Sequence, residues 1–237
     1  ESVPGPRRQQ LHAHAATALE ALDPVPLGQC ARHLRYAGRL AEWVDASERA
    51  AHQASQLGDD EEAARLLEDV LRHAPLRGER RGELAVKLTV AAGRSRHCSE
   101  DIIDLLSEVT EEEMPRVVRG QLRLRQGTLL ERFGADLHAR RAVLTEAVKD
   151  LAELPHLHAQ AMVGLALPGV PGVPLPEIRR WLFRIIELLP TVEVPGFRVG
   201  LRGKVAMVQV EIGDPQWREL SEQNTQEAQE TPRHRAA

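Results

Sequence analysis

A cluster of small and basic residues late in the chain is the first feature that could indicate phosphate chemistry. It consists of Gly196, Gly200, Gly203 and Lys204. A phosphate-binding loop follows a strand and reads Gly-x-x-x-x-Gly-Lys, then Ser or Thr, so that backbone N–H groups surround the phosphate and the hydroxyl reaches Mg²⁺. Here Arg198 replaces the first glycine of that pattern, Val205 follows the lysine, and no strand is predicted before them. The cluster therefore does not predict a nucleotide site.

Histidines and cysteines give little indication of a metal site. Two histidine pairs are spaced two residues apart, namely His12 with His14 and His156 with His158. On a helix this spacing directs the two rings to different faces, so neither pair can chelate a metal in place. His97 and Cys98 lack further donors, and Cys30 lies far from Cys98. We therefore expect no metal, no cofactor, and reduced thiols in the cytoplasm.

Acidic clusters fit helix starts better than catalysis. Residues 59–62 and 111–113 are acidic runs that precede predicted helices, where negative groups interact favourably with the helix dipole and free N–H groups. Thr110 with Glu113 matches a capping box. No Ser, His and Asp arrangement or nucleophile elbow is present. We expect a non-enzyme; an all-α enzyme is the alternative, and it would need acidic or His residues clustered in one cavity.

The arginines are the strongest candidates for a binding surface. One set occupies a stripe of a predicted helix: Arg116, Arg119 and Arg123. A second set lies beside aromatic residues: Arg179, Arg180 and Arg184, with Trp181 and Phe183. Such patches bind anions, phosphate or acidic protein surfaces. A solvated face that pairs with nearby Glu is nevertheless the favoured interpretation of these arginines, and for Trp181, Leu182, Phe183 and Ile185 packing in the core is favoured over a ligand groove.

The elements that position these residues are predicted to be helices throughout. Leu, Ala, Glu and Arg dominate the sequence, and strand patterns are nearly absent. The predicted helices cover about 6–22, a segment through 30–37 that ends at Gly38, then 40–57, 61–74, 77–93, 100–109, 116–133, 137–153, 157–167, 177–189, 197–212 and 215–229. Short connections with Gly or Pro, such as Gly93, Gly134, Pro155, Pro190 and Gly213, predict antiparallel hairpins.

The helix predicted over 116–133 favours a stack of hairpins over a simple bundle. Its apolar residues lie on two faces, which is typical of a helix inside an array. Gly120 and Gly127 lower its helix propensity, and we expect them to let a neighbouring helix approach closely. We predict a helical-repeat array over 1–167, a Pro/Gly-rich connection over 168–176, and further helical hairpins over 177–237.

Composition limits the function. The formal net charge is −4, which differs from the basic footprint of an isolated nucleic-acid-binding domain. No run of apolar residues is long enough to cross a bilayer, and the first ten residues lack the apolar core of a signal peptide. We therefore expect no direct nucleic-acid or membrane partner. Both ends of the sequence resemble cut points, which leads us to expect a piece of a longer protein.

The segment 44–75 resembles a tetratricopeptide repeat, a motif of two antiparallel helices with small residues at their contact. The matching positions are Ala50, Ala51, Ala54, Gly58, Ala63, Leu67 and Pro75. The aromatic positions differ, because Ser47 stands where Trp is usual and Ala54 where Tyr is usual. Two weaker units lie around 124–147 and 206–214. The resemblance implies an all-α fold in which helical hairpins stack as a right-handed superhelix with a concave binding surface.

A wider resemblance involves the Leu11-His12 helix, the segment 31–34 and the repeat over 58–71. These are similar to the junction and sensor region of large ATP-binding transcriptional regulators of the LuxR type and of related actinobacterial antibiotic regulators. The resemblance implies a sensor that binds a protein partner, a small effector or another copy of itself, and controls ATPase and DNA-binding modules outside this sequence. The sequence contains neither a phosphate loop nor a helix-turn-helix module. A stand-alone repeat adaptor is the alternative.

Overall fold

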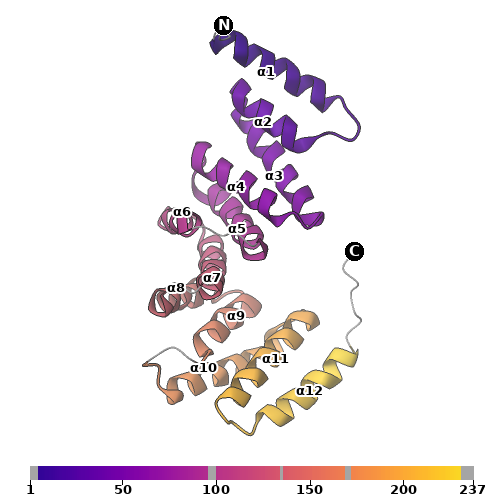
Figure 1. Ribbon diagram of the computed structural model, residues 1–237. Coiled ribbons are helices and arrows are strands. Elements are labelled where there is room, and N and C mark those ends of the chain that lie inside the picture. Colours follow the sequence, from indigo (N-terminus) through magenta and orange to yellow (C-terminus); the bar gives the residue numbers. More distant parts are fainter. Residues whose placement is uncertain (1–4, 96–99, 134–135, 169–171, 231–237) are drawn as a thin grey trace. The chain divides into compact units, whose positions relative to one another are not determined.

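The computed structural model describes residues 5–95, 100–133, 136–168 and 172–230, and all regular elements within them are helical (Figure 1). The chain divides into two compact units, Glu1–Met114 (unit 1) and Pro115–Ala237 (unit 2). The all-α prediction is confirmed. Each of the predicted helices is present, with ends that differ by a few residues at most.

The described residues of unit 1 form six helices: α1 (Gly5–Glu20), α2 (Leu27–Ala37), α3 (Leu40–Gln56), α4 (Asp60–His73), α5 (Gly78–Arg94) and α6 (Glu100–Thr110). Each helix packs on the next one along the chain. Glycines with left-handed backbone make two of the turns, because Gly38 has φ 75° and Gly58 has φ 80°. The residue after each glycine donates its N–H back into the helix, so these turns end the helices as the sequence predicted.

The predicted repeat over 44–75 forms the hairpin of α3 and α4. Ala50, Ala51, Ala63 and Leu67 are buried, and Ala54 is half-buried. Gly58 lies exposed in the turn, and Pro75 follows the end of α4. The Asp59 side chain accepts the N–H of Glu62 at 3.1 Å and caps α4, as expected for an acidic helix start.

Unit 2 contains α7 (Arg116–Arg132), α8 (Leu137–Asp150), α9 (Pro155–Ala166), α10 (Leu175–Leu188), the short 3₁₀ helix η1 (Leu189–Thr191), α11 (Pro195–Glu211) and α12 (Trp217–Glu230). Consecutive helices pack together, and α9 also contacts α7 and α11. The described part of the Pro/Gly-rich segment over 168–176 joins α9 to α10, which pack against each other.

Close helix approach in unit 2 depends on glycine, as predicted for two positions. A Cβ built on Gly120 would lie 2.8 Å from the Cβ of Asp150, and one on Gly127 would lie 2.6 Å from Leu144 Cδ2. A Cβ built on Gly164 of α9 would lie 2.7 Å from Cδ1 of the same leucine. Leu144 of α8 therefore inserts between two glycines on α7 and α9.

Three local predictions are wrong. Thr110 does not open a capping box, because it is the last residue of α6 and its hydroxyl donates to the carbonyl of Leu106 at 2.7 Å. Gly93 does not form a turn, since α5 continues to Arg94. Helix periodicity also predicts a buried stripe of Leu11, Ala15, Leu19 and Leu22 in the first helix, but the buried residue of α1 is Ala16, and Leu11 is 54% exposed. Gly134 lies outside the described residues.

Candidate functional site

The first arginine set surrounds one buried carboxylate. Asp150 lies at the C-terminal end of α8, with 7% of its side chain exposed. Arg123 Nη1 donates to Asp150 Oδ2 at 2.6 Å, and Arg119 Nε donates to the same oxygen at 3.3 Å. Arg116 Nε lies 3.5 Å from Oδ1. Arg116 also donates to the carbonyl of Lys149 at 2.9 Å.

This arrangement joins α7 to α8. The three guanidinium groups satisfy the carboxylate and one carbonyl at the end of α8, next to the point where Gly120 lets the two helices touch. The geometry therefore agrees with the structural interpretation of these arginines more than with an open anion patch. Sequence reasoning missed Asp150 because its pairing depends on the relative rotation of two helices. A lone Asp at a helix end was its only signal.

The second arginine set divides between two environments. Arg179 and Arg180 are exposed on α10, whereas the Cζ of Arg184 lies 5.4 Å from the centroid of the Trp181 ring. Trp181 packs against two apolar clusters of unit 2, and its Nε1 is buried with no hydrogen-bond partner among the described residues. The basic side chains are accessible, but Trp181 belongs mainly to the core.

Phe183 corrects a prediction. Leu182 and Ile185 are buried as expected for core residues, but Phe183 is 62% exposed. On α10 the buried stripe consists of Ile178, Leu182 and Ile185. Because successive residues turn by about 100° around a helix, Phe183 points away from that stripe.

A groove in unit 1 lies mainly between α3 and α5. The cavity has a volume of about 270 Å³, and we call it the unit 1 groove. Its walls are formed by Glu48, Ala51, His52, Ser55, Leu67, Val86, Lys87, Val90, Ala91 and Arg94. The floor is apolar, since Ala51, Leu67 and Ala91 are buried. A shallower depression that shares Glu48, His52 and Lys87 adds Arg49 at one end.

Basic side chains dominate the rim of the unit 1 groove. Glu48 is already paired, because it accepts a hydrogen bond from Arg80 Nη2 at 2.5 Å and another from Lys87. Burial raises the pKa of Glu48, but the hydrogen bonds from Lys87 and Arg80 outweigh burial and keep that pKa below its usual value. Arg49 and Arg94 are exposed and form no ion pair within the described part of the chain. The rim therefore carries excess positive charge.

A second cavity of unit 1 lies at the position where Ser47 replaces the usual aromatic residue. It has a volume of about 270 Å³ and lies among α2, α3 and α4. Arg35 stacks 5.2 Å from the ring centroid of Trp43 and donates to Asp69 at 2.5 Å. The Ser47 side chain is fully buried, and its hydroxyl has no hydrogen-bond partner in the described residues. The charged Arg35 and Asp69 of this cavity thus already pair with each other.

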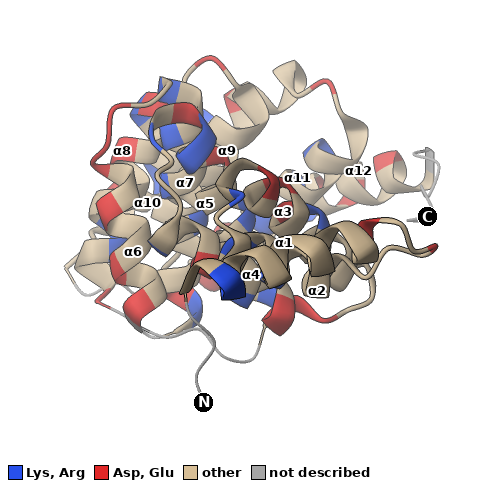
Figure 2. Cartoon of the chain, turned by 90° about the horizontal axis from the view of Figure 1, so that it is seen from above, with Lys and Arg blue, Asp and Glu red and all other residues tan. Residues whose placement is uncertain are grey.

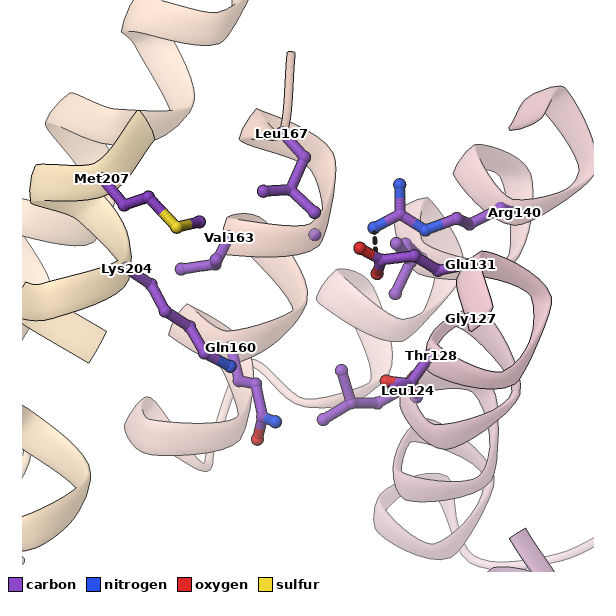
Figure 3. Close-up of a pocket in the computed structure, with 12 residues that line it drawn as sticks. Leu124, Gly127, Thr128, Glu131, Arg140, Gln160, Val163, Leu167, Lys204 and Met207 are labelled. Carbon is purple, nitrogen blue, oxygen red and sulfur yellow. Dashed lines mark hydrogen bonds and ion pairs between the residues drawn. The ribbon is translucent and has the colours of Figure 1, made fainter. Parts of the chain in front are cut away.

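A cavity in unit 2 lies among α7, α8, α9 and α11, and we call it the unit 2 pocket (Figure 3). Its volume is about 200 Å³. It is lined by Leu124, Gly127, Thr128, Glu131, Arg140, Leu144, Gln160, Val163, Gly164, Leu167, Lys204 and Met207. Figure 3 shows Arg140 and Glu131 on one side and Lys204 and Met207 on the other, with residues of α9 between them.

Arg140 is the unusual member of the unit 2 pocket. Only 3% of the residue is exposed, yet within the described ranges it has one hydrogen-bond partner, Glu131, whose Oε2 accepts from Nη2 at 2.9 Å. The Nε of Arg140 is buried without a partner among the described residues. Burial of a guanidinium is unfavourable unless its donors are satisfied. Arg140 was not predicted to be a site residue from the sequence. The only feature of the sequence that could have indicated a cavity beside it is the pair of glycines Gly127 and Gly164, which line the same pocket.

The remaining candidates for chemistry lie apart. His12 and His33 approach each other between α1 and α2, with Nδ1 atoms 3.0 Å apart, and His158 Nδ1 donates to the carbonyl of Val148 at 2.8 Å. The glycine cluster at 196–204 lies within the helix α11, so it forms no phosphate loop. His97 and Cys98 fall outside the described residues. Where the chain is described, no group of three or more His, Cys, Asp or Glu is placed to hold a metal ion.

No family model, no curated protein and no solved structure matches this chain. None of the described helices combines the length and the apolar character needed to cross a membrane. Charged residues are interspersed along the helices (Figure 2), and many of them form ion pairs within a unit. Function must therefore be inferred from the cavities described above and from the surfaces around them.

Proposed function

We propose that this chain is a non-catalytic helical-repeat sensor and protein-interaction module, and that the unit 1 groove binds an acidic, amphipathic segment of a partner protein. One observation carries the proposal: an apolar floor lies beneath a basic rim in a chain whose formal net charge is −4. The local excess of positive charge is therefore a property of this groove and not of the whole surface.

The apolar floor supplies the affinity that an exposed patch of charges lacks. Val86 and Val90 of α5 are half-buried and line the groove beside the buried Ala51 and Ala91. A Leu or Phe side chain of a partner helix that covers these residues would remove apolar surface from water, which stabilises a complex by about 25 cal/mol per Å² before the cost of association.

The basic rim selects for acidic partners. Lys87 is held by Glu48, while Arg94 lines the groove and Arg49 lines the adjoining depression. Complementary charge increases the association rate and disfavours basic competitors. This recognition mode, in which an amphipathic helix binds in a groove between helices, requires no catalytic group in the module.

The resemblance to the sensor region of LuxR-type regulators supports a larger context for this module. In that context the groove binds a cytoplasmic partner, and occupancy shifts ATPase and DNA-binding modules of the same protein between two states. Reading the gene outward from both ends tests this part separately. A gene that encodes no ATPase module upstream and no DNA-binding module downstream would instead identify a stand-alone adaptor.

A peptide selection tests the groove directly. Displayed random peptides are selected on the chain, and the binders are measured by fluorescence polarisation as synthetic peptides. We expect peptides with Asp or Glu around one or two large apolar residues, and binding that weakens as salt increases. The double variant Arg49→Glu with Arg94→Glu should reduce affinity at least about tenfold.

The control makes the same charge change elsewhere. Arg179→Glu with Arg180→Glu reverses two exposed charges on α10 and should leave the affinity of the selected peptides unchanged. If this control abolishes binding while the groove variant does not, the partner surface is the basic face of α10. Selected peptides without acidic residues would also contradict the proposal.

A further inference from the structure

We propose that the unit 2 pocket binds a small monocarboxylate with an apolar tail, whose carboxylate pairs with Arg140. This goes beyond the proposed protein-interaction role, because it assigns a small-molecule ligand to a different unit of the chain. The inference starts from a guanidinium that is almost completely buried and yet lies at the wall of a cavity.

The pairing of Arg140 is incomplete. A guanidinium has five N–H donors, whereas Arg140 donates one hydrogen bond, to Glu131, among the residues that the structure describes. The Glu131 side chain is itself 49% exposed at the mouth of the pocket, so water competes for it. Figure 3 shows one terminal nitrogen of Arg140 on the bond to Glu131 and the other pointing away from Glu131, with the guanidinium on the side of the cavity opposite Lys204 and Met207. A second carboxylate in this position would accept the remaining terminal donors in the planar geometry that arginine favours.

A glycine keeps the space beside the guanidinium open. A Cβ built on Gly164 would lie 3.6 Å from Arg140 Nη2 and 2.7 Å from Leu144 Cδ1. No larger residue fits at this position without displacing the leucine. The cavity next to Arg140 is therefore maintained by the packing of α8 against α9.

The charge balance of the pocket selects a monoanion. Arg140 and Lys204 are positive and Glu131 is negative, so one positive charge is unbalanced. A dianion would leave one negative charge without a partner in a site that is mostly apolar. A neutral ligand would leave the positive charge of the pocket unbalanced.

The apolar walls and the size define the rest of the ligand. Leu124, Val163, Leu167 and Met207 surround the centre of the pocket. The volume of about 200 Å³ is below the range of about 300–1,000 Å³ that is usual for drug-sized ligands. A short branched aliphatic chain fits both properties, while a nucleotide is too large.

The experiment uses 4-methylpentanoate as the probe and the full chain with isotope labels. Nuclear magnetic resonance titration gives both the affinity and the residues whose signals shift. The comparison ligands are 4-methylpentanamide, which has the same shape without the charge, and inorganic phosphate. We expect millimolar or tighter binding of the carboxylate, with shifts confined to residues around Arg140 and Val163. Binding of the amide and of phosphate should be at least about tenfold weaker.

Two variants separate binding from folding. Arg140→Gln should lower the affinity for the carboxylate probe at least about tenfold, although loss of a buried charge can also unfold unit 2. Glu131→Gln avoids that problem because Glu131 is half-exposed. It removes the only competing carboxylate, so the probe should bind severalfold more tightly than to the unmodified chain. Arg180→Gln, on the exposed face of α10, is the matched control and should change nothing.

Three outcomes would overturn the proposal. The first is equal affinity for the amide and the carboxylate, and the second is weaker carboxylate binding to Glu131→Gln. The third is the absence of any carboxylate binding to both the unmodified chain and Glu131→Gln. Signal shifts confined to unit 1 would place the anion elsewhere and count against the proposal as well. None of these outcomes affects the peptide selection on the unit 1 groove.

Discussion

The two units bring their helices together with different residues. In unit 1 the hairpin of α3 and α4 uses alanines from both helices, among them Ala50, Ala51 and Ala63. In unit 2 a single large side chain, Leu144, inserts against Gly127 on α7 and Gly164 on α9. Similar close contact thus arises from small residues facing small residues, or from a large residue facing glycines.

This difference affects both the sequence signal and the tolerance to substitution. Alanine favours helix, so the unit 1 contact is made without loss of helix propensity. Each glycine inside a helix lowers stability by roughly 0.5–1 kcal/mol relative to alanine, and burial of one leucine contributes about 1.5–3 kcal/mol. The unit 2 contact is therefore stable only while Leu144 fills the space between the glycines, and it should be the less tolerant of the two.

The largest expected effect tests the charge clusters that accompany the two contacts. Asp150→Asn in unit 2 removes the carboxylate shared by Arg116, Arg119 and Arg123 and leaves guanidinium groups without a buried partner. We expect a loss of about 2–3 kcal/mol in the free energy of unfolding, below the 3–5 kcal/mol of a fully buried pair because the arginines are partly exposed. Urea unfolding followed by circular dichroism gives this value.

The matched change in unit 1 is Glu48→Gln, which removes the carboxylate shared by Arg80 and Lys87. Because Lys87 is half-exposed, the loss should be about 1 kcal/mol or less. If both substitutions cost the same, burial of the shared carboxylate does not distinguish the two clusters.

The next effect addresses the helix contacts themselves. Gly127→Ala adds a methyl group 2.6 Å from Leu144 Cδ2, and the resulting overpacking should lower stability by about 1–3 kcal/mol despite the better helix propensity of alanine. Gly200→Ala is the control in the same unit, since nothing lies within 4 Å of its Cβ. That control should raise stability by up to about 1 kcal/mol.

The reverse substitution in unit 1 completes this test. Ala50→Gly removes a methyl group from the alanine contact without creating a clash, and it should cost about 1 kcal/mol through helix propensity and lost packing. A stabilising effect of Gly127→Ala would show that α7 and α8 can move apart freely, and the contrast between the units would disappear.

The same difference between the units explains which parts of the fold could be predicted from the sequence. Helix ends were predictable because local residues determine them, such as Gly38, Gly58 and Asp59. The hairpin over 44–75 was predictable because alanines lie on the facing sides of two helical segments that are separated by Gly58. In unit 2 the small residues are glycines, and their partner is a leucine on the next helix, so the repeat signature is weak although the contact is close.

Site residues were harder to predict, for a physical reason. Arg140 and Arg141 are neighbours in sequence, but their surroundings differ. Arg140 is only 3% exposed and lines the unit 2 pocket, whereas Arg141 forms an ion pair with Glu177 of α10. Local patterns give the face of a helix but not which neighbour covers it. The same limit explains Asp150, whose three partners lie on a different helix, and Phe183, which faces away from the core of unit 2.

A smaller effect distinguishes the units by pH. Burial lowers the pKa of His158 in unit 2, with a further decrease from Arg184, and burial also lowers the pKa of His33 in unit 1, assisted by His12 and Arg32. A histidine whose pKa is lower in the folded state is protonated more readily in the unfolded chain. Each therefore contributes stability that is complete above the unfolded pKa of about 6.5 and is lost as pH falls through the folded pKa.

The measurement is the melting temperature between about pH 7 and pH 5. His158→Gln should flatten the decrease in melting temperature at acidic pH more than His33→Gln does, because burial lowers the pKa of the more enclosed His158 even though its hydrogen bond to the carbonyl of Val148 acts in the opposite direction. An unchanged pH profile in His158→Gln would show that this ring does not differ in proton affinity between the folded and unfolded chain.

The smallest effect is expected where the units should not differ at all. Arg65 pairs with Glu62 on α4 at 2.6 Å, and Lys149 pairs with Glu146 on α8 at 2.5 Å; both cations are more than half exposed. Solvent screening and side-chain entropy limit such pairs to a few tenths of a kcal/mol. Arg65→Gln and Lys149→Gln should therefore each change the free energy of unfolding by less than about 0.5 kcal/mol. A larger loss for Lys149→Gln alone would mean that the end of α8 is sensitive to any change of charge, and the effect of Asp150→Asn could then no longer be assigned to its three arginines.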